Sequence, residues 1–344
     1  MSDISVSTRN NTGLIYLKRP QALNALTMDM CAAIETALSD WRDDNQIQQV
    51  ILYAEGERAF CAGGDVAALY HMGKDGKIDQ INAFWREEYR MNSFIAHYPK
   101  PVIAMMQGYV MGGGVGIGCH ASHRIICETT KLAMPECAIG LVPDVGGSYL
   151  LARTKGHIGE YMALTGARIN PADILATGFA DYHITLDKWE ALRSEIIEHN
   201  TLDVIDALSS PAEAPSQLEP DRDEIDSLFG QPTVGDFSAA IAASETEFTA
   251  SIKKAMGRSS PLSMASIFTL IREVRKADNI DSALDWEYRF TSRAIEHADF
   301  LEGVRAVLID KDHAPHWRHK DINDVPDSLI DQLFAPASRT TGLR

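Results

Sequence analysis

Short apolar segments with the character of strands alternate with segments of helical periodicity along the first half of the chain. Between the first two strands, apolar residues recur from Met30 to Trp41 at the spacing of one helix face, and Thr27 precedes them as an N-cap. Such alternation is typical of an α/β fold, and it predicts an α/β core through about residue 185. The strand segments are "GLIYLK" (13–18), "QVILYAE" (49–55), "KPVIAMMQGYV" (100–110) and "HRIICE" (123–128).

The pattern becomes helical in the last hundred residues. Ser260 and Pro261 suit the N-cap and first position of a helix. Residues Leu284, Tyr288, Thr291 and Ile295 mark one face of another helix. We therefore predict two parts, a core (1–205) and a mainly helical C-terminal region (206–344).

Charge and cysteine content limit the partners and the compartment. The 344 residues carry a net charge of −16 and no basic block, which argues against nucleic acid as a partner. Five cysteines, without a C-x-x-C pair, favour free thiols in a reducing compartment. The N-terminal residues resemble neither a signal nor a transit peptide, and no apolar run reaches membrane-spanning length. We expect a soluble, cytoplasmic protein with no membrane partner.

Two glycine-rich segments follow strands. "FCAGGD" (60–65) reads as a tight turn or a close backbone approach, and "GYVMGGGVGIGCH" (108–120) as a strand entering a helix start. Unpaired N–H groups at a helix start suit a phosphate or a developing oxyanion. The second segment matches neither G-x-G-x-x-G nor a P-loop. Close packing of helix against strand is the structural alternative, and both can hold.

Two carboxylates stand in apolar surroundings in "AMPECAIGLVPDVGGSY" (133–149). Glu136 and Asp144 each follow a proline, and no lysine or arginine lies between them. A buried, unpaired carboxylate is costly, so such groups shift their pKa, find hydrogen bonds or serve chemistry. Capping of a helix start is the structural alternative. His120 and His123 lack further ligands nearby in sequence, so we expect no metal site.

In this order, the motifs resemble the crotonase (enoyl-CoA hydratase/isomerase) superfamily. The resemblance runs from "LKRPQALNAL" through "FCAGGD", "GYVMGGG", "MPECAIGLVPDVGG" and "ALTGARI" to "FLEGVRAVL". It implies a spiral of ββα units with a helical C-terminal region, and an acyl-CoA thioester whose enolate or oxyanion is stabilised. It also implies a homo-oligomer, a trimer or hexamer, and no cofactor, since CoA is part of the substrate.

The resemblance assigns roles to four residues near the glycines. The backbone N–H groups of Gly64 and Gly113 would form an oxyanion hole. The backbone near Ala62 would receive the adenine of CoA, and Arg58 would lie near its phosphates.

A departure from the hydratase pattern favours one branch of the superfamily. Hydratases carry a second glutamate where this chain has Gly116, so hydration is disfavoured, whereas an isomerase needs only the glutamate at Glu136. The Glu136–Asp144 spacing, "WREEY" with Glu88 as a substrate-binding residue, and "GVRAVLIDKDHAPHW" resemble 3-hydroxyisobutyryl-CoA hydrolases. The resemblance implies hydrolysis of a 3-hydroxyacyl-CoA. The alternatives are an enoyl-CoA isomerase or hydratase, or a non-catalytic acyl-CoA-binding protein.

Overall fold

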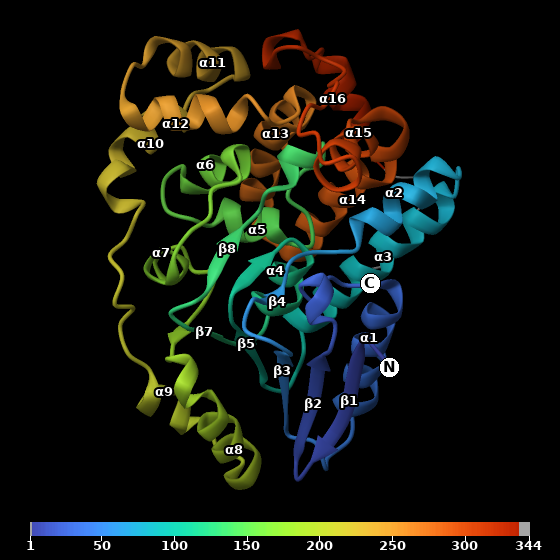
Figure 1. Cartoon of the computed structure of the whole chain (residues 1–344), viewed down its shortest axis with the longest axis vertical. Helices are drawn as coiled ribbons and strands as arrows, with labels where there is room; N and C mark the ends of the chain where they lie inside the picture. The colour runs from blue at the N-terminus through green and yellow to red at the C-terminus, as the bar shows by residue number, and fades with distance from the viewer. Residues whose placement is uncertain (1, 337–344) are drawn as a thin grey trace. The chain divides into compact units, whose positions relative to one another are not determined.

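The computed structural model describes residues 2–336 of the chain, which are drawn as a ribbon in Figure 1. The chain forms two compact units, and each combines separate stretches of sequence. The sequence-based division into residues 1–205 and 206–344 stays a prediction. The first unit holds residues up to 64, 90–132 and 169–217, and the second holds 65–89, 133–168 and those from 218 on.

A six-stranded sheet of order β1–β2–β3–β5–β7–β9 forms the centre of the first unit. β1 is antiparallel to β2, whereas every other neighbouring pair is parallel. The predicted α/β class is confirmed, and the segments predicted at 13–18, 49–55 and 123–128 coincide with β2, β3 and β7. The strands are β1 (Ile4–Arg9), β2 (Thr12–Leu17), β3 (Gln49–Ala54), β5 (Val102–Met106), β7 (His123–Ile126) and β9 (Tyr182–His183).

The strand predicted at 100–110 is two strands. Gly108 has a φ of +59°, and a Cβ atom there would lie 2.3 Å from the carbonyl oxygen of Arg58. Only glycine fits such a turn. At this turn the chain leaves the six-stranded sheet and enters a second sheet. That sheet has the order β4–β6–β8, with β4 (Ala59–Cys61), β6 (Tyr109–Met111) and β8 (Lys131–Ala133).

Helix α1 (Met28–Arg42) confirms the predicted helix and its cap. The Thr27 side chain accepts a hydrogen bond from the N–H of Met30. The face from Met30 to Trp41 is buried, as its spacing predicts. The first unit also contains α4 (Gly113–Gly118) and α7 (Pro171–Ala176).

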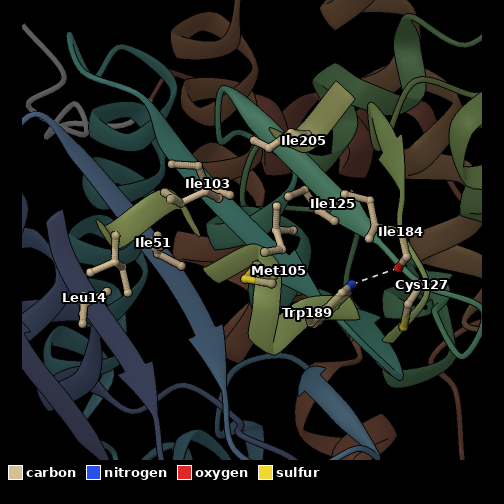
Figure 2. Close-up of a cluster of buried hydrophobic side chains, with 12 residues drawn as sticks. Leu14, Ile51, Ile103, Met105, Ile125, Cys127, Ile184, Trp189 and Ile205 are labelled. Atoms are coloured by element: carbon tan, nitrogen blue, oxygen red, sulfur yellow. Dashed lines mark hydrogen bonds between the residues drawn. The ribbon is translucent and has the colours of Figure 1, made fainter. Parts of the chain in front are cut away.

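A cluster of buried apolar side chains joins the six-stranded sheet to α8 (Trp189–His199) and α9 (Asp203–Leu208), as Figure 2 shows. Ile51 and Met105 come from the sheet and are fully buried. The indole N–H of Trp189 donates to the carbonyl oxygen of Ile184 at 2.9 Å, which satisfies the one polar group of this side chain.

The second unit is mainly helical. Ser260 caps α13 by accepting from the N–H of Ser263. Among the described residues, none of the helices combines the length and apolar character that a membrane span needs. α3 has residues in both units. The main helices are α2 (Val66–Lys74), α3 (Ile78–Ala96), α5 (Gly147–Ala152), α6 (Ile158–Thr165), α10 (Arg222–Phe229), α11 (Val234–Ala243), α12 (Glu247–Met256), α13 (Pro261–Ala277), α14 (Ile280–His297), α15 (Phe300–Val304) and α16 (Asp327–Phe334).

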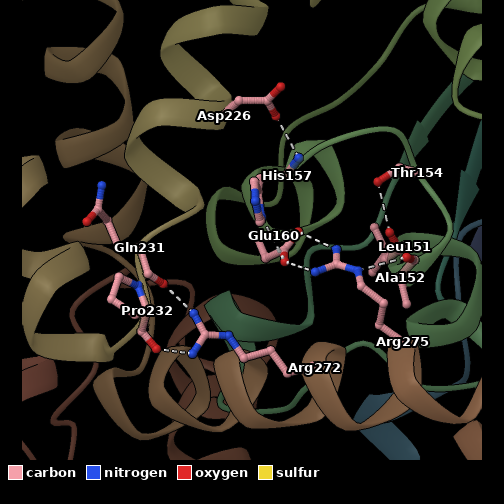
Figure 3. A network of polar contacts seen from close by, with 10 residues as sticks. All are labelled: Leu151, Ala152, Thr154, His157, Glu160, Asp226, Gln231, Pro232, Arg272 and Arg275. Atoms are coloured by element: carbon pink, nitrogen blue, oxygen red, sulfur yellow. Dashed lines mark hydrogen bonds and ion pairs between the residues drawn. The ribbon is translucent and has the colours of Figure 1, made fainter.

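A polar network ties α13 to α5 and α6, and Figure 3 draws it. Arg275 on α13 donates to both carboxylate oxygens of Glu160, at 2.7 and 3.0 Å, and to the carbonyl oxygen of Ala152 at 3.1 Å. Glu160 is almost fully buried, so this bidentate pair satisfies a charge that water does not reach.

Candidate active site

Four carboxylates are buried in the second unit. Sequence analysis identified three of them and missed the fourth, Glu287. For none of the four does a lysine or arginine among the described residues contribute to the electrostatic environment. The four are Glu88 on α3, Glu136 in the 3-10 helix η2 (Glu136–Ile139), Asp144 in the loop that follows, and Glu287 on α14, with exposed fractions of 2%, 6%, 6% and 0%.

The short helix η2 sets the position of Glu136. Gly140 ends η2 with a φ of +74°, and a Cβ atom there would lie 2.4 Å from the backbone of Asp299. The N–H of Ser260 donates to the carbonyl oxygen of Cys137 at 3.0 Å. Because backbone from two later segments packs directly against η2, the backbone that carries the Glu136 side chain is held in place.

Asp144 lies in an unusual turn. The next residue, Val145, has a φ of +56°, which is rare for a β-branched residue, and Gly146 follows at +76°. The hydroxyl of Tyr89 donates to Oδ2 of Asp144 at 2.7 Å and lies 3.3 Å from Oγ1 of Thr291. The Asp144 carboxylate therefore has a directed side-chain hydrogen bond on Oδ2, in addition to a hydrogen bond from its own backbone N–H.

Glu287 bonds the backbone just beyond Asp144. Its Oε2 accepts from the N–H of Gly146 at 2.8 Å, and its Oε1 accepts from the N–H of Ser148 at 3.1 Å and from the Ser148 hydroxyl. One signal in the sequence could have found it, since Glu287 lies one turn after Leu284 on the predicted helix face. That pattern alone does not separate an inward glutamate from a surface one.

Burial raises the pKa of all four carboxyl groups. It is the largest cause in each case, and it raises the pKa of Asp144 to about 6 and that of Glu287 to about 8. The charge of Asp144 adds to the rise at Glu88 and Glu136, whose pKa values lie well above their usual range. The hydrogen bond from Tyr89 opposes the rise at Asp144. A raised pKa brings the titration of a carboxyl group closer to neutral pH, the range in which a general acid or base works.

Two of the carboxylate oxygens are buried without a hydrogen-bond partner among the described residues. They are Oε1 of Glu88 and Oε2 of Glu136. Buried polar atoms in proteins are almost always bonded, so an unbonded pair in one region suits a ligand or a reacting water. Glu136, with its raised pKa, could accept a proton from such a water.

The proposed oxyanion-hole residues belong to the first unit. Gly113 is the first residue of α4, so its N–H has no acceptor within the helix. Leu26 donates to the carbonyl oxygen of Gly63, and the N–H of the neighbouring Gly64 has no acceptor among the described residues. Both groups can donate, and the role itself stays a prediction.

The surroundings of Gly114 confirm the structural alternative, close packing of helix against strand. A Cβ atom on Gly114 would lie 2.1 Å from the carbonyl oxygen of Cys61, so α4 packs backbone to backbone against β4. The glycine run therefore allows close packing, and it also places Gly113 at the start of α4, where its N–H has no acceptor within the helix. The packing interpretation is confirmed, and the oxyanion role stays a prediction.

The residues predicted to contact CoA also lie in the first unit. The N–H of Ala62 donates to the carbonyl oxygen of Leu23 at 3.1 Å, and the Arg58 side chain is exposed in the turn before β4. His123 lies 3.0 Å from the hydroxyl of Ser122 through Nδ1. Across residues 2–336, no group of three or more His, Cys, Asp or Glu side chains is arranged to hold a metal ion.

The chain belongs to the enoyl-CoA hydratase/isomerase family, because the model of that family matches residues 12–334. The predicted family resemblance and crotonase-like fold are thereby confirmed.

Relatives within the family bear different names. The 3-hydroxyisobutyryl-CoA hydrolase, mitochondrial, of Danio rerio is 36% identical over 97% of this chain and 90% of its own length. A solved enoyl-CoA hydratase from Rhodobacter sphaeroides is 46% identical with a TM-score of 0.92, and covers 97% of this chain and 98% of its own. A solved carnitinyl-CoA dehydratase from Mycobacterium thermoresistibile is 36% identical with a TM-score of 0.94, over 100% and 99%.

Proposed function

We propose that this chain hydrolyses a 3-hydroxyacyl-CoA thioester, 3-hydroxyisobutyryl-CoA, to the free 3-hydroxy acid and CoA. The observation that carries the proposal is the buried pair Glu136 and Asp144, which has raised pKa values and no ion pair with a lysine or arginine among the described residues. Such groups serve proton transfer and recognition of a hydroxyl group better than they serve stability. The hydrolase name of the zebrafish relative supports the same reaction.

Glu136 is the proposed reacting group. Its free Oε2 takes a proton from water while the water oxygen bonds to the thioester carbon, or attacks that carbon itself to give an anhydride that water then opens. In both routes the carbon–sulfur bond breaks and CoA leaves as the thiolate, which takes up a proton.

Gly64 and Gly113 are the proposed oxyanion donors. Their N–H groups would bond the thioester oxygen as it gains negative charge. Loss of one such donor lowers the rate by about two to three powers of ten in enzymes that use this device. The position of Gly113 at the start of α4, where its N–H has no acceptor within the helix, supports the assignment.

Asp144 and Glu88 are proposed to recognise the substrate's 3-hydroxyl. Asp144 is buried and the Tyr89 hydroxyl orients its carboxylate, and Oε1 of Glu88 is buried without a partner among the described residues. We propose that Ala62 meets the adenine of CoA through its backbone and that Arg58, an exposed cation, meets the phosphates.

A hydratase is the second candidate, since the 46% identical solved structure bears that name. Gly116 argues against it, because α4 then offers no carboxylate to share the work of Glu136. An isomerase needs no hydroxyl recognition, so its activity would survive the loss of Asp144. A non-catalytic acyl-CoA-binding protein would bind thioesters without turnover.

One assay separates these activities. Release of CoA from 3-hydroxyisobutyryl-CoA is followed with a thiol-reactive dye, and the double bond of crotonyl-CoA is followed in parallel. Rapid CoA release without hydration is expected, and Glu136→Gln should abolish turnover while leaving thioester binding intact. Hydration without CoA release, or normal hydrolysis by Glu136→Gln, would refute the assignment.

We further propose a cytoplasmic protein that works without a cofactor and assembles as a trimer or hexamer. All five cysteines are free and buried, in keeping with a reducing compartment. The zebrafish relative is named mitochondrial, so cell fractionation is the relevant test of location. Light scattering of the purified chain tests its oligomeric state.

A further inference from the structure

Helix α14 holds the Asp144 turn at two points. Glu287 accepts the N–H groups of Gly146 and Ser148, just beyond Asp144. Thr291, one helical turn further along, lies 3.3 Å from the Tyr89 hydroxyl that donates to the Asp144 carboxylate. One helix therefore contacts both the backbone that carries Asp144 and the side chain that orients it.

The turn needs such a support. Val145 is buried and has a φ of +56°, a strained conformation for a β-branched residue that persists only where the surroundings enforce it. The bonds from Gly146 and Ser148 to Glu287 flank this residue on its C-terminal side and hold the backbone there.

The amide form of this side chain cannot replace it. Glu287 presents an acceptor at each end, one toward Gly146 and one toward Ser148. Glutamine has one acceptor and one donor end, so its NH₂ group would face an N–H donor on one side. The turn would have to move, and Asp144 would move with it.

We propose that Glu287 is a positioning residue for recognition of the substrate's 3-hydroxyl, acting through the turn that carries Asp144. The inference rests on the proposed function. Glu287 itself has both oxygens occupied by Gly146 and Ser148, so its effect on the substrate passes through Asp144.

The test measures binding of two thioesters by calorimetry in a Glu136→Gln background, in which both are stable. We expect 3-hydroxyisobutyryl-CoA to bind at least tenfold more tightly than isobutyryl-CoA, which lacks the hydroxyl. Adding either Asp144→Asn or Glu287→Gln should reduce that ratio to near one. Ser148→Ala, which removes one of three donors to Glu287, should reduce it partly.

Glu160→Gln is the matched control, because it also replaces a buried glutamate of the second unit by its amide. It should lower the melting temperature and keep the binding ratio, which separates positioning from general destabilisation.

Each outcome has a separate meaning. A background variant without preference for the hydroxylated thioester, or preference retained in Asp144→Asn, would count against the proposed function. A ratio lost with Asp144→Asn but kept with Glu287→Gln would overturn the positioning role. If Glu287→Gln does not fold, an unchanged ratio in Ser148→Ala overturns it instead.

Discussion

Replacement of Asp144 by asparagine should stabilise the fold, and the gain should grow with pH. Asparagine has the shape of the neutral acid, and its Oδ1 can still accept from Tyr89, which donates to Asp144 at 2.7 Å. Burial opposes ionisation of the wild-type carboxyl group and raises its pKa from 3.8 to about 6. The asparagine of the variant stays neutral at every pH, so it carries no such cost.

The sign follows from the raised folded-state pKa. The native state binds the Asp144 proton more tightly than the unfolded chain does, so this proton's stabilising contribution is complete below pH 3.8 and is lost as the pH rises through about 6. Two pKa units correspond to about 3 kcal/mol at pH 8. The same linkage gives about 1.5 kcal/mol at pH 5, where part of the native population is still protonated.

Thermal unfolding at matched ionic strength measures this difference. At roughly 2 °C per kcal/mol, Asp144→Asn should melt about 6 °C above wild type at pH 8 and about 3 °C above it at pH 5. Glu213→Gln, which changes an exposed carboxylate, should follow wild type at both pH values. An advantage that is absent at pH 8, or larger at pH 5 than at pH 8, would refute the reasoning.

Three further substitutions test the packing. Arg275→Met should lower the free energy of unfolding by about 3–5 kcal/mol, because it leaves the buried charge of Glu160 without a partner. Denaturant titration measures this loss, which should be smaller when Glu160→Gln is added. Gly114→Ala places a methyl group 2.1 Å from the carbonyl oxygen of Cys61, so circular dichroism should report a sharply lower melting temperature; a normal one would contradict the packing described for α4. Trp189→Phe removes one buried hydrogen bond and should cost about 1–3 kcal/mol in a urea titration, with no loss expected if water replaces the indole N–H.

The parallel sheet is predictable because its signals are local. Each central strand is a continuous apolar run in the sequence. The helix caps at Thr27 and Ser260 are also local, because each side chain accepts a hydrogen bond from the N–H three residues later. β1 gave no such signal, since most of its residues are polar and exposed. Its place depends on pairing with β2.

The candidate site is only partly predictable. Glu136 and Asp144 stand out because their neighbours in sequence are apolar. Glu287 does not, because the turn it holds lies 141 residues away and its own neighbours are those of an ordinary amphipathic helix. The division of the predicted strand at Gly108 is not predictable for a similar reason. The backbone of Arg58, which leaves no room for a side chain at Gly108, belongs to the turn before β4 and lies far from Gly108 in sequence.

Within residues 2–336, the buried carboxylates have no lysine or arginine counter-ion, and this feature joins these observations. Arg86, two residues before Glu88 on α3, donates to the hydroxyl of Tyr288 at 2.9 Å rather than to a carboxylate. A guanidinium bonded to Asp144 would hold its pKa low and make the fold more stable, but the carboxylate would then be a weaker base and a poorer acceptor for a substrate hydroxyl. Neutral donors, the Tyr89 hydroxyl and two N–H groups at Glu287, satisfy the oxygens without supplying positive charge. The stability that Asp144→Asn should recover is therefore the same free energy that keeps the group reactive.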